Sequence, residues 1–155
     1  MRVRIGAGLA LLALATVFSA PADAAKMCAW MTEKDEPQDR LLTIYLSSDT
    51  EVHFFFKVGG KGIVDKEGDG ANAPNDGTFV LQAGQTDSPW QFGTTLYPPG
   101  AIDVSIEIHQ KPEDIFSDKP TPLWTTFTFR RSIPANEKKA PTILSKKQCA
   151  IVPGH

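Results

Sequence analysis

The segment from residue 65 to residue 76 has the spacing of oxygen ligands found in a calcium-binding loop. Counted from Asp65, carboxylates stand at the first, third, fifth and twelfth positions, and Gly70 occupies the sixth. The carboxylate residues are Asp65, Glu67, Asp69 and Asp76. In an EF-hand, side chains at these positions converge on a hard cation, while glycine permits the sharp turn. Calcium is therefore a candidate ligand of this segment.

The same segment departs from the EF-hand pattern at several positions. Glu67 stands where aspartate or asparagine is usual, and Asp76 replaces the longer glutamate that binds the ion in bidentate fashion. Asn72 takes the place of an apolar anchor, and Pro74 stiffens the second half of the loop. Glycine, asparagine and aspartate are also typical of exposed turns. We therefore predict a solvated loop, with calcium binding as the alternative.

Two glutamate–histidine pairs form a second candidate metal site. Glu51 lies two residues before His53, and Glu107 lies two residues before His109, so each pair shares one face of an extended strand. If the two strands were neighbours, the four side chains would offer carboxylate and imidazole ligands to zinc. Ordinary alternation of solvent-facing residues produces the same pattern, and we favour that interpretation.

Cys28 and Cys149 are the two cysteines of the chain, and they lie near opposite ends of it. An even pair of cysteines in an exported protein indicates a disulfide, which here would close a loop of about 120 residues. A redox or catalytic thiol is the alternative. Neither a C-x-x-C spacing nor a cluster of basic residues around one cysteine supports that alternative, so we predict a structural Cys28–Cys149 bridge.

The connection from residue 110 to residue 122 has features of a recognition loop. It contains three prolines and carries Ile115 and Phe116 among charged residues. Loops of this length are uncommon in compact domains and are often functional. A stiff loop with an apolar pair at its tip would present an anchor to a partner at low entropic cost. Alternatively, Ile115 and Phe116 fold back and cap the end of the domain, and we favour the cap.

The first 24 residues have the pattern of a secretory signal peptide. A basic start is followed by an apolar stretch over residues 5–18, and Ala22-Asp23-Ala24 provides a small-x-small cleavage site. The apolar stretch is shorter than the roughly 20 residues that a membrane span needs. We therefore expect residues 25–155 to form a single domain without a transmembrane segment. The signal predicts export to the periplasm or the extracellular medium.

The remaining composition argues against several classes of protein. Without the signal peptide, 14 basic and 17 acidic residues remain, which excludes a globally basic nucleic-acid binder. The motifs G-x-S-x-G, H-E-x-x-H and G-x-G-x-x-G and the P-loop are absent. We therefore expect a protein without catalytic activity or a bound cofactor. The segment 130–147 is locally basic, and we expect it to pair lightly with the acidic residues before position 40 or, alternatively, to bind an anionic surface.

Alternating apolar residues predict an all-β fold in which these candidate sites are placed. Residues 102–108 and 52–58 show the clearest period of two, with isoleucine, valine and phenylalanine on one face. In residues 123–129 the same periodicity places Leu123 inward. No stretch has the apolar stripe of a helix. The predicted strands cover residues 41–47, 51–58, 61–64, 78–82, 91–97, 101–109, 123–131 and 142–144, after a polar lead-in over residues 25–40.

Seven or eight short strands separated by turns favour a two-layer antiparallel β-sandwich, and a partly closed β-barrel is the alternative. For function, we expect a non-enzymatic binding domain that recognises an unidentified protein or a component of the cell envelope. One rival is a module that depends on calcium or zinc. The other is an inhibitor or immunity-type protein that acts through the 110–122 loop.

Overall fold

The computed structural model describes residues 24–36, 40–61, 75–94, 100–114, 116–117, 119–133 and 143–154. Within these residues the secondary structure consists of strands, with no helix. The strands are β1 (Ala24–Asp35), β2 (Arg40–Ser48), β3 (Val52–Lys61), β4 (Asn75–Leu81), β5 (Thr86–Thr94), β6 (Gly100–Gln110), β7 (Leu123–Ile133), β8 (Ile143–Leu144) and β9 (Gln148–Pro153). No helix in the described part of the chain could cross a membrane.

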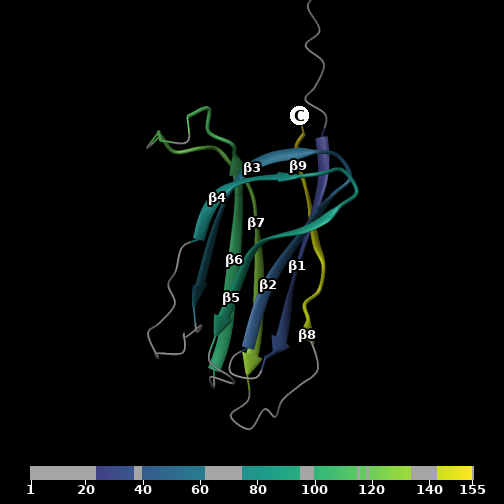
Figure 1. Cartoon of the computed structure of the whole chain (residues 1–155), viewed down its shortest axis with the longest axis vertical. Coiled ribbons are helices and arrows are strands. Elements are labelled where there is room, and N and C mark those ends of the chain that lie inside the picture. The colour runs from purple at the N-terminus through teal and green to yellow at the C-terminus, as the bar shows by residue number, and fades with distance from the viewer. Residues whose placement is uncertain are drawn as a thin grey trace, which may run out of the picture.

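The strands form two antiparallel sheets that pack against each other (Figure 1), which confirms the predicted β-sandwich. The first sheet has the order β5-β2-β1, with β8 and β9 following one another along the outer side of β1. The second sheet has the order β4-β3-β6-β7. The sheets do not close into a barrel, so the alternative is wrong.

The core lies between the sheets and follows the predicted alternation. In β3 and β6 the inward-facing positions are almost completely buried, and the residues between them reach the outer face. Burial of branched and aromatic side chains on one face of each strand is the main force that holds the layers together. The buried apolar residues of these two strands are Val52, Phe54, Phe56, Val58, Ile102, Val104, Ile106 and Ile108.

The prediction of a polar lead-in over residues 25–40 is wrong, because these residues include β1, an interior strand of its sheet. The inward positions of β1 include Ala25, Met27, Ala29 and Met31, all of which are buried. Alanine and methionine are not typical strand formers, so their period-two spacing gave a weak signal among the charged residues. Pairing with β2 on one side and with β8 and β9 on the other makes this segment a strand.

Two strands at sheet edges also differ from the predicted ranges. β5 begins at Thr86 and runs through Pro89, which lies where the register between β2 and β5 shifts. Proline, which has no N–H to donate, is tolerated at edges and bulges. β9 had no predicted counterpart. The predicted strand over residues 61–64 lies outside the described residues except for Lys61, the last residue of β3.

A β-bulge at the start of β7 reverses the expected orientation of two side chains. Ile108 pairs with Thr125 and His109 pairs with Leu123, so Trp124 is an extra residue in β7. Beyond the bulge, Leu123 is 54% exposed, whereas Trp124 is partly buried and packs against the core. The prediction that Leu123 faces inward is therefore wrong, because a bulge shifts the alternation by one residue.

The predicted disulfide is present, with the Cys28 and Cys149 sulfurs 2.05 Å apart. The two cysteines lie directly opposite each other in β1 and β9, so the bridge fastens an edge strand to its neighbour. A disulfide is compatible with an exported protein. The predicted signal peptide falls outside the described residues, apart from Ala24 at its cleavage site.

Candidate functional site

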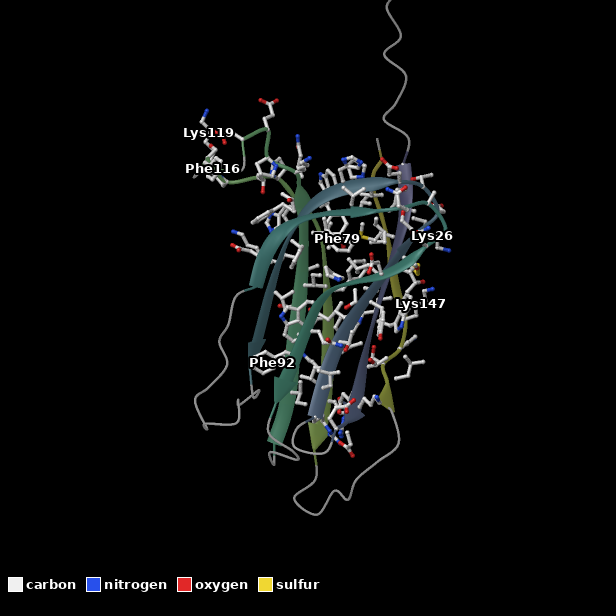
Figure 2. All side chains as sticks on the ribbon, viewed as in Figure 1. Lys26, Phe79, Phe92, Phe116, Lys119 and Lys147 are labelled. Atoms are coloured by element: carbon white, nitrogen blue, oxygen red, sulfur yellow. A yellow bond between two sulfur atoms is a disulfide. The ribbon has the colours of Figure 1, made fainter. Side chains whose placement is uncertain are left out.

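The 110–122 loop projects from one end of the sandwich, at the upper left of Figure 1, where β6 ends and β7 begins. Phe116 is 88% exposed, and in Figure 2 it lies near Lys119 at the tip, away from both sheets. The prediction that the apolar pair caps the sandwich is therefore wrong for Phe116. Ile115, the other member of the pair, lies outside the described residues.

A hydrogen-bonded turn holds Phe116 in this position. The Phe116 backbone N–H donates to Asp114 Oδ1 over 2.9 Å, and the Ser117 backbone N–H donates to the Asp114 carbonyl over 3.1 Å. This is the arrangement of an Asx turn, in which an aspartate side chain replaces part of the backbone hydrogen bonding. Lys119 continues the pattern by donating its N–H to Ser117 Oγ over 3.3 Å.

The base of the loop is tied to the end of the sheet by a hydrogen-bonded histidine. The Gln110 N–H donates to the Pro122 carbonyl over 2.9 Å, which closes the loop at its neck. His109 is buried, with Nδ1 3.2 Å from the Thr121 carbonyl and Nε2 2.9 Å from Glu107 Oε2. Both partners are hydrogen-bond acceptors, so a ring nitrogen that carries a hydrogen donates to the partner beside it. These contacts hold the two ends of the loop together at its neck.

A hollow of about 490 Å³ lies beside the neck of the loop. Its volume falls within the range of small-molecule sites, roughly 300 to 1,000 Å³. The bulged residue Trp124 contributes an aromatic wall, and β3, the loop and the C-terminal end of β9 contribute the rest. The lining residues include His53, Gln110, Lys111, Glu113, Trp124 and Pro153. We refer to this hollow, together with the 110–122 loop, as the loop-bearing end.

In the candidate zinc site, each histidine contacts the glutamate two residues before it, and the two pairs remain separate. His53 Nε2 lies 2.7 Å from Glu51 Oε1, and the His109 ring contacts its own Glu107. β3 and β6 are neighbours, as the hypothesis required, but their register places Phe55 opposite His109. The Phe55 ring meets the His109 ring edge-on at 6.1 Å. Among the described residues, no three His, Cys, Asp or Glu side chains are grouped as a metal site.

Most of the candidate calcium ligands lie outside the described residues. Asp65, Glu67 and Asp69 are not described, whereas Asp76 is exposed and belongs to β4, opposite Lys57 of β3. The predicted loop therefore ends earlier than expected, because β4 already begins at Asn75. A position in a paired strand gives Asp76 an extended backbone, unlike the final ligand of an EF-hand loop, which lies in a helix.

Sequence reasoning missed a buried group of charges at the opposite end of the sandwich. Glu33 accepts hydrogen bonds from Arg131 Nε at 2.8 and 2.9 Å and from Arg40 Nη1 at 3.1 Å. The Glu33 and Arg40 side chains are 2% and 1% exposed, and Arg40 Nε also contacts Asp35 Oδ1 at 3.2 Å. Arg131 belongs to the second sheet, so this group connects both layers. The expected pairing of acidic and basic segments is found here, but the contact is buried rather than solvated.

Lys147, another residue of the basic segment, contacts an aromatic side chain instead of a carboxylate. Lys147 Nζ lies 4.5 Å from the centre of the Trp30 ring, and Trp30 also stacks on Tyr45 with ring centres 5.8 Å apart. A cation over an aromatic face is a favourable contact. It brings the short stretch between β8 and β9 onto the outer face of β1. Residues 134–142 of this segment lie outside the described residues.

No family model, curated protein or solved structure matches the chain. Its function must therefore be inferred from its own side chains. The buried charges around Glu33 have a sufficient structural role in joining the two sheets. The 110–122 loop, by contrast, exposes Phe116 at its tip and contributes Lys111 and Glu113 to the hollow at its neck, and neither feature has an evident role in folding.

Proposed function

We propose that the protein is an exported, non-enzymatic domain that binds another macromolecule through its loop-bearing end. The observation that carries this proposal is the exposure of Phe116 on a hydrogen-bonded turn. Burying a phenylalanine side chain gains roughly 1.5 to 3 kcal/mol, and Phe116 gains little of this within the folded chain. A partner with an apolar pocket would supply the missing burial.

The hydrogen bonds among the described residues of the loop support the same proposal. Immobilising a flexible side chain or loop on binding costs free energy, and a loop that is already ordered avoids much of that cost. Aromatic residues surrounded by polar groups are frequent hot spots of protein interfaces. The partner is a protein or a component of the cell envelope. An enzyme whose cleft receives the 110–122 loop is one form that the partner could take.

The expected location follows from two features of the chain. The Cys28–Cys149 disulfide is typical of proteins that fold in an oxidising compartment. The N-terminal pattern of a basic start, an apolar stretch and a small-x-small site predicts secretion. We propose that the mature domain acts in the periplasm or the extracellular medium.

Replacement of Phe116 by alanine should separate binding from stability. Because the ring is 88% exposed, we expect the free energy of unfolding in urea to change by less than about 0.5 kcal/mol, as for most surface substitutions. Binding to the partner should weaken by about 2 kcal/mol or more, the loss expected for a hot-spot residue. The partner is first isolated by its binding to the wild-type domain. Calorimetric titration of the wild-type and variant domains with that partner then measures the loss.

Leu144 provides a matched control, since it is also apolar and 65% exposed but lies on β8. Leu144→Ala should leave both stability and binding unchanged. A Phe116→Ala variant that unfolds more easily but binds as well as wild type would contradict the proposal, because the ring would then have a structural role.

A further inference from the structure

We propose that the hollow beside the loop binds a neutral sugar, with Trp124 as the surface on which a sugar ring lies. This inference rests on the proposed binding function and names a class of ligand for the loop-bearing end. Its first support is the bulge in β7. Without the extra residue, the alternation of β7 would place Leu123 inward and Trp124 outward. The bulge instead makes the Trp124 indole a wall of the hollow.

Bulges often reorient a side chain at a functional site, and the tryptophans of this chain show how Trp124 differs. Of the chain's three tryptophans, Trp90 is 4% exposed and stacks on Phe92 in the core. Trp30 stacks on Tyr45 and has Lys147 over its ring. Trp124 packs on the core and also borders open space. It can therefore offer an apolar surface to a ligand.

The polar residues around Trp124 favour a neutral ligand over a charged one. Lys111 and Glu113 carry opposite charges, so a small anion or a small cation meets a like charge at the rim. Both side chains are exposed, and ion pairs in contact with water contribute little. The affinity must therefore come from the aromatic wall and from hydrogen bonds.

A sugar matches this combination of groups. One face of a pyranose ring presents C–H groups that pack on an indole, while its hydroxyls both donate and accept hydrogen bonds. Glu113 accepts, Lys111 donates, and the Gln110 amide can do either. A hollow of about 490 Å³ has room for one or two sugar rings. Pro112 and Pro153 add stiff apolar walls that lose little entropy on binding.

The test follows the indole N–H signals of the ¹⁵N-labelled domain by NMR during titration with chitobiose, cellobiose and maltose. Tryptophan-to-phenylalanine variants assign the signals. We expect at least one disaccharide to shift the Trp124 signal saturably, with a Kd on the order of 1 mM. The Trp30 and Trp90 signals should remain in place. Glucuronate, glucosamine and the zwitterion dialanine should shift the Trp124 signal less than the best disaccharide at equal concentration.

Variants make the test specific. Trp124→Ala should weaken binding of that disaccharide at least about tenfold, whereas Trp30→Ala should bind it as wild type does. If Trp124→Ala does not fold, Glu113→Ala and Lys111→Ala are used in its place. Both residues are exposed, so these substitutions should leave the fold intact. Each should then weaken binding at least about threefold.

Three results would each overturn the inference. The first is that no disaccharide shifts the Trp124 signal at a concentration of about 20 mM. The second is that the variants of residues lining the hollow bind the disaccharide as tightly as wild type does. The third is that a charged probe or dialanine binds more tightly than the best disaccharide. Failure here is distinguishable from failure of the proposed function. If the disaccharides do not bind but Phe116→Ala still weakens binding to a macromolecular partner, only the sugar inference is wrong.

Discussion

Reduction of the Cys28–Cys149 disulfide should lower the free energy of unfolding by about 4 to 5 kcal/mol. The two cysteines are 121 residues apart in sequence, so the bridge removes much of the conformational freedom of the unfolded chain. The native sheet should persist after reduction, because β9 keeps its backbone pairing with β1. Urea denaturation of the oxidised and reduced domain measures the difference.

A Cys28→Ala, Cys149→Ala variant provides the control for this prediction. It should unfold near the midpoint of the reduced wild type, and the reductant should have no further effect on it. The oxidised, denatured wild type should contain no free thiol that reacts with an alkylating reagent. Equal midpoints for the oxidised and reduced wild type would contradict the prediction.

Replacement of Glu33 by alanine should cost about 3 kcal/mol, near the lower end of the range for breaking a buried ion pair. The substitution takes from Arg40 and Arg131 the carboxylate that they share. The cost stays at the lower end because Arg40 still contacts Asp35 and because the Arg131 side chain is 17% exposed to water. Thermal and urea denaturation of Glu33→Ala and wild type measure the loss.

Glu36 is a suitable control because it is an acidic residue near the end of β1 whose side chain is 36% exposed. It accepts a hydrogen bond from Lys34 at 2.8 Å and thereby raises the pKa of that ammonium group. Both side chains of this pair contact water, so Glu36→Ala should unfold at the same midpoint as wild type. If Glu33→Ala and Glu36→Ala are equally stable, the charges around Glu33 do not hold the sheets together.

The strands whose apolar residues are large or β-branched could be predicted from sequence. In β6, four such residues alternate with polar ones, and each of the four is buried. In β1 the inward-facing positions are occupied by alanine, methionine and the ion-paired Glu33. Periodicity recognises a strand by the contrast between its two faces, and in β1 that contrast is weak. Its position was determined by neighbouring strands that are distant in sequence.

The candidate site could be predicted only in part. Loop length and proline content pointed to residues 110–122, and the apolar pair at its tip drew attention to Phe116. The direction of that side chain depends on the turn at Asp114, which sequence alone left open. Trp124 was not a candidate, because its position in the hollow follows from a bulge that is defined only by pairing with β6. Its deviation from the alternation became visible only in the folded sheet.

Photo-crosslinking from position 116 is the most direct test of a binding site at the loop-bearing end. A benzophenone amino acid replaces Phe116 in one sample and Leu144 in another, and each protein is irradiated in extract from cells that produce it. We expect a discrete adduct from position 116, identified by mass spectrometry and suppressed by excess unlabelled wild-type domain but not by excess Phe116→Ala domain. Position 144 should give no such adduct. An adduct from position 144 alone, or one from position 116 that both competitors suppress equally, would contradict the account.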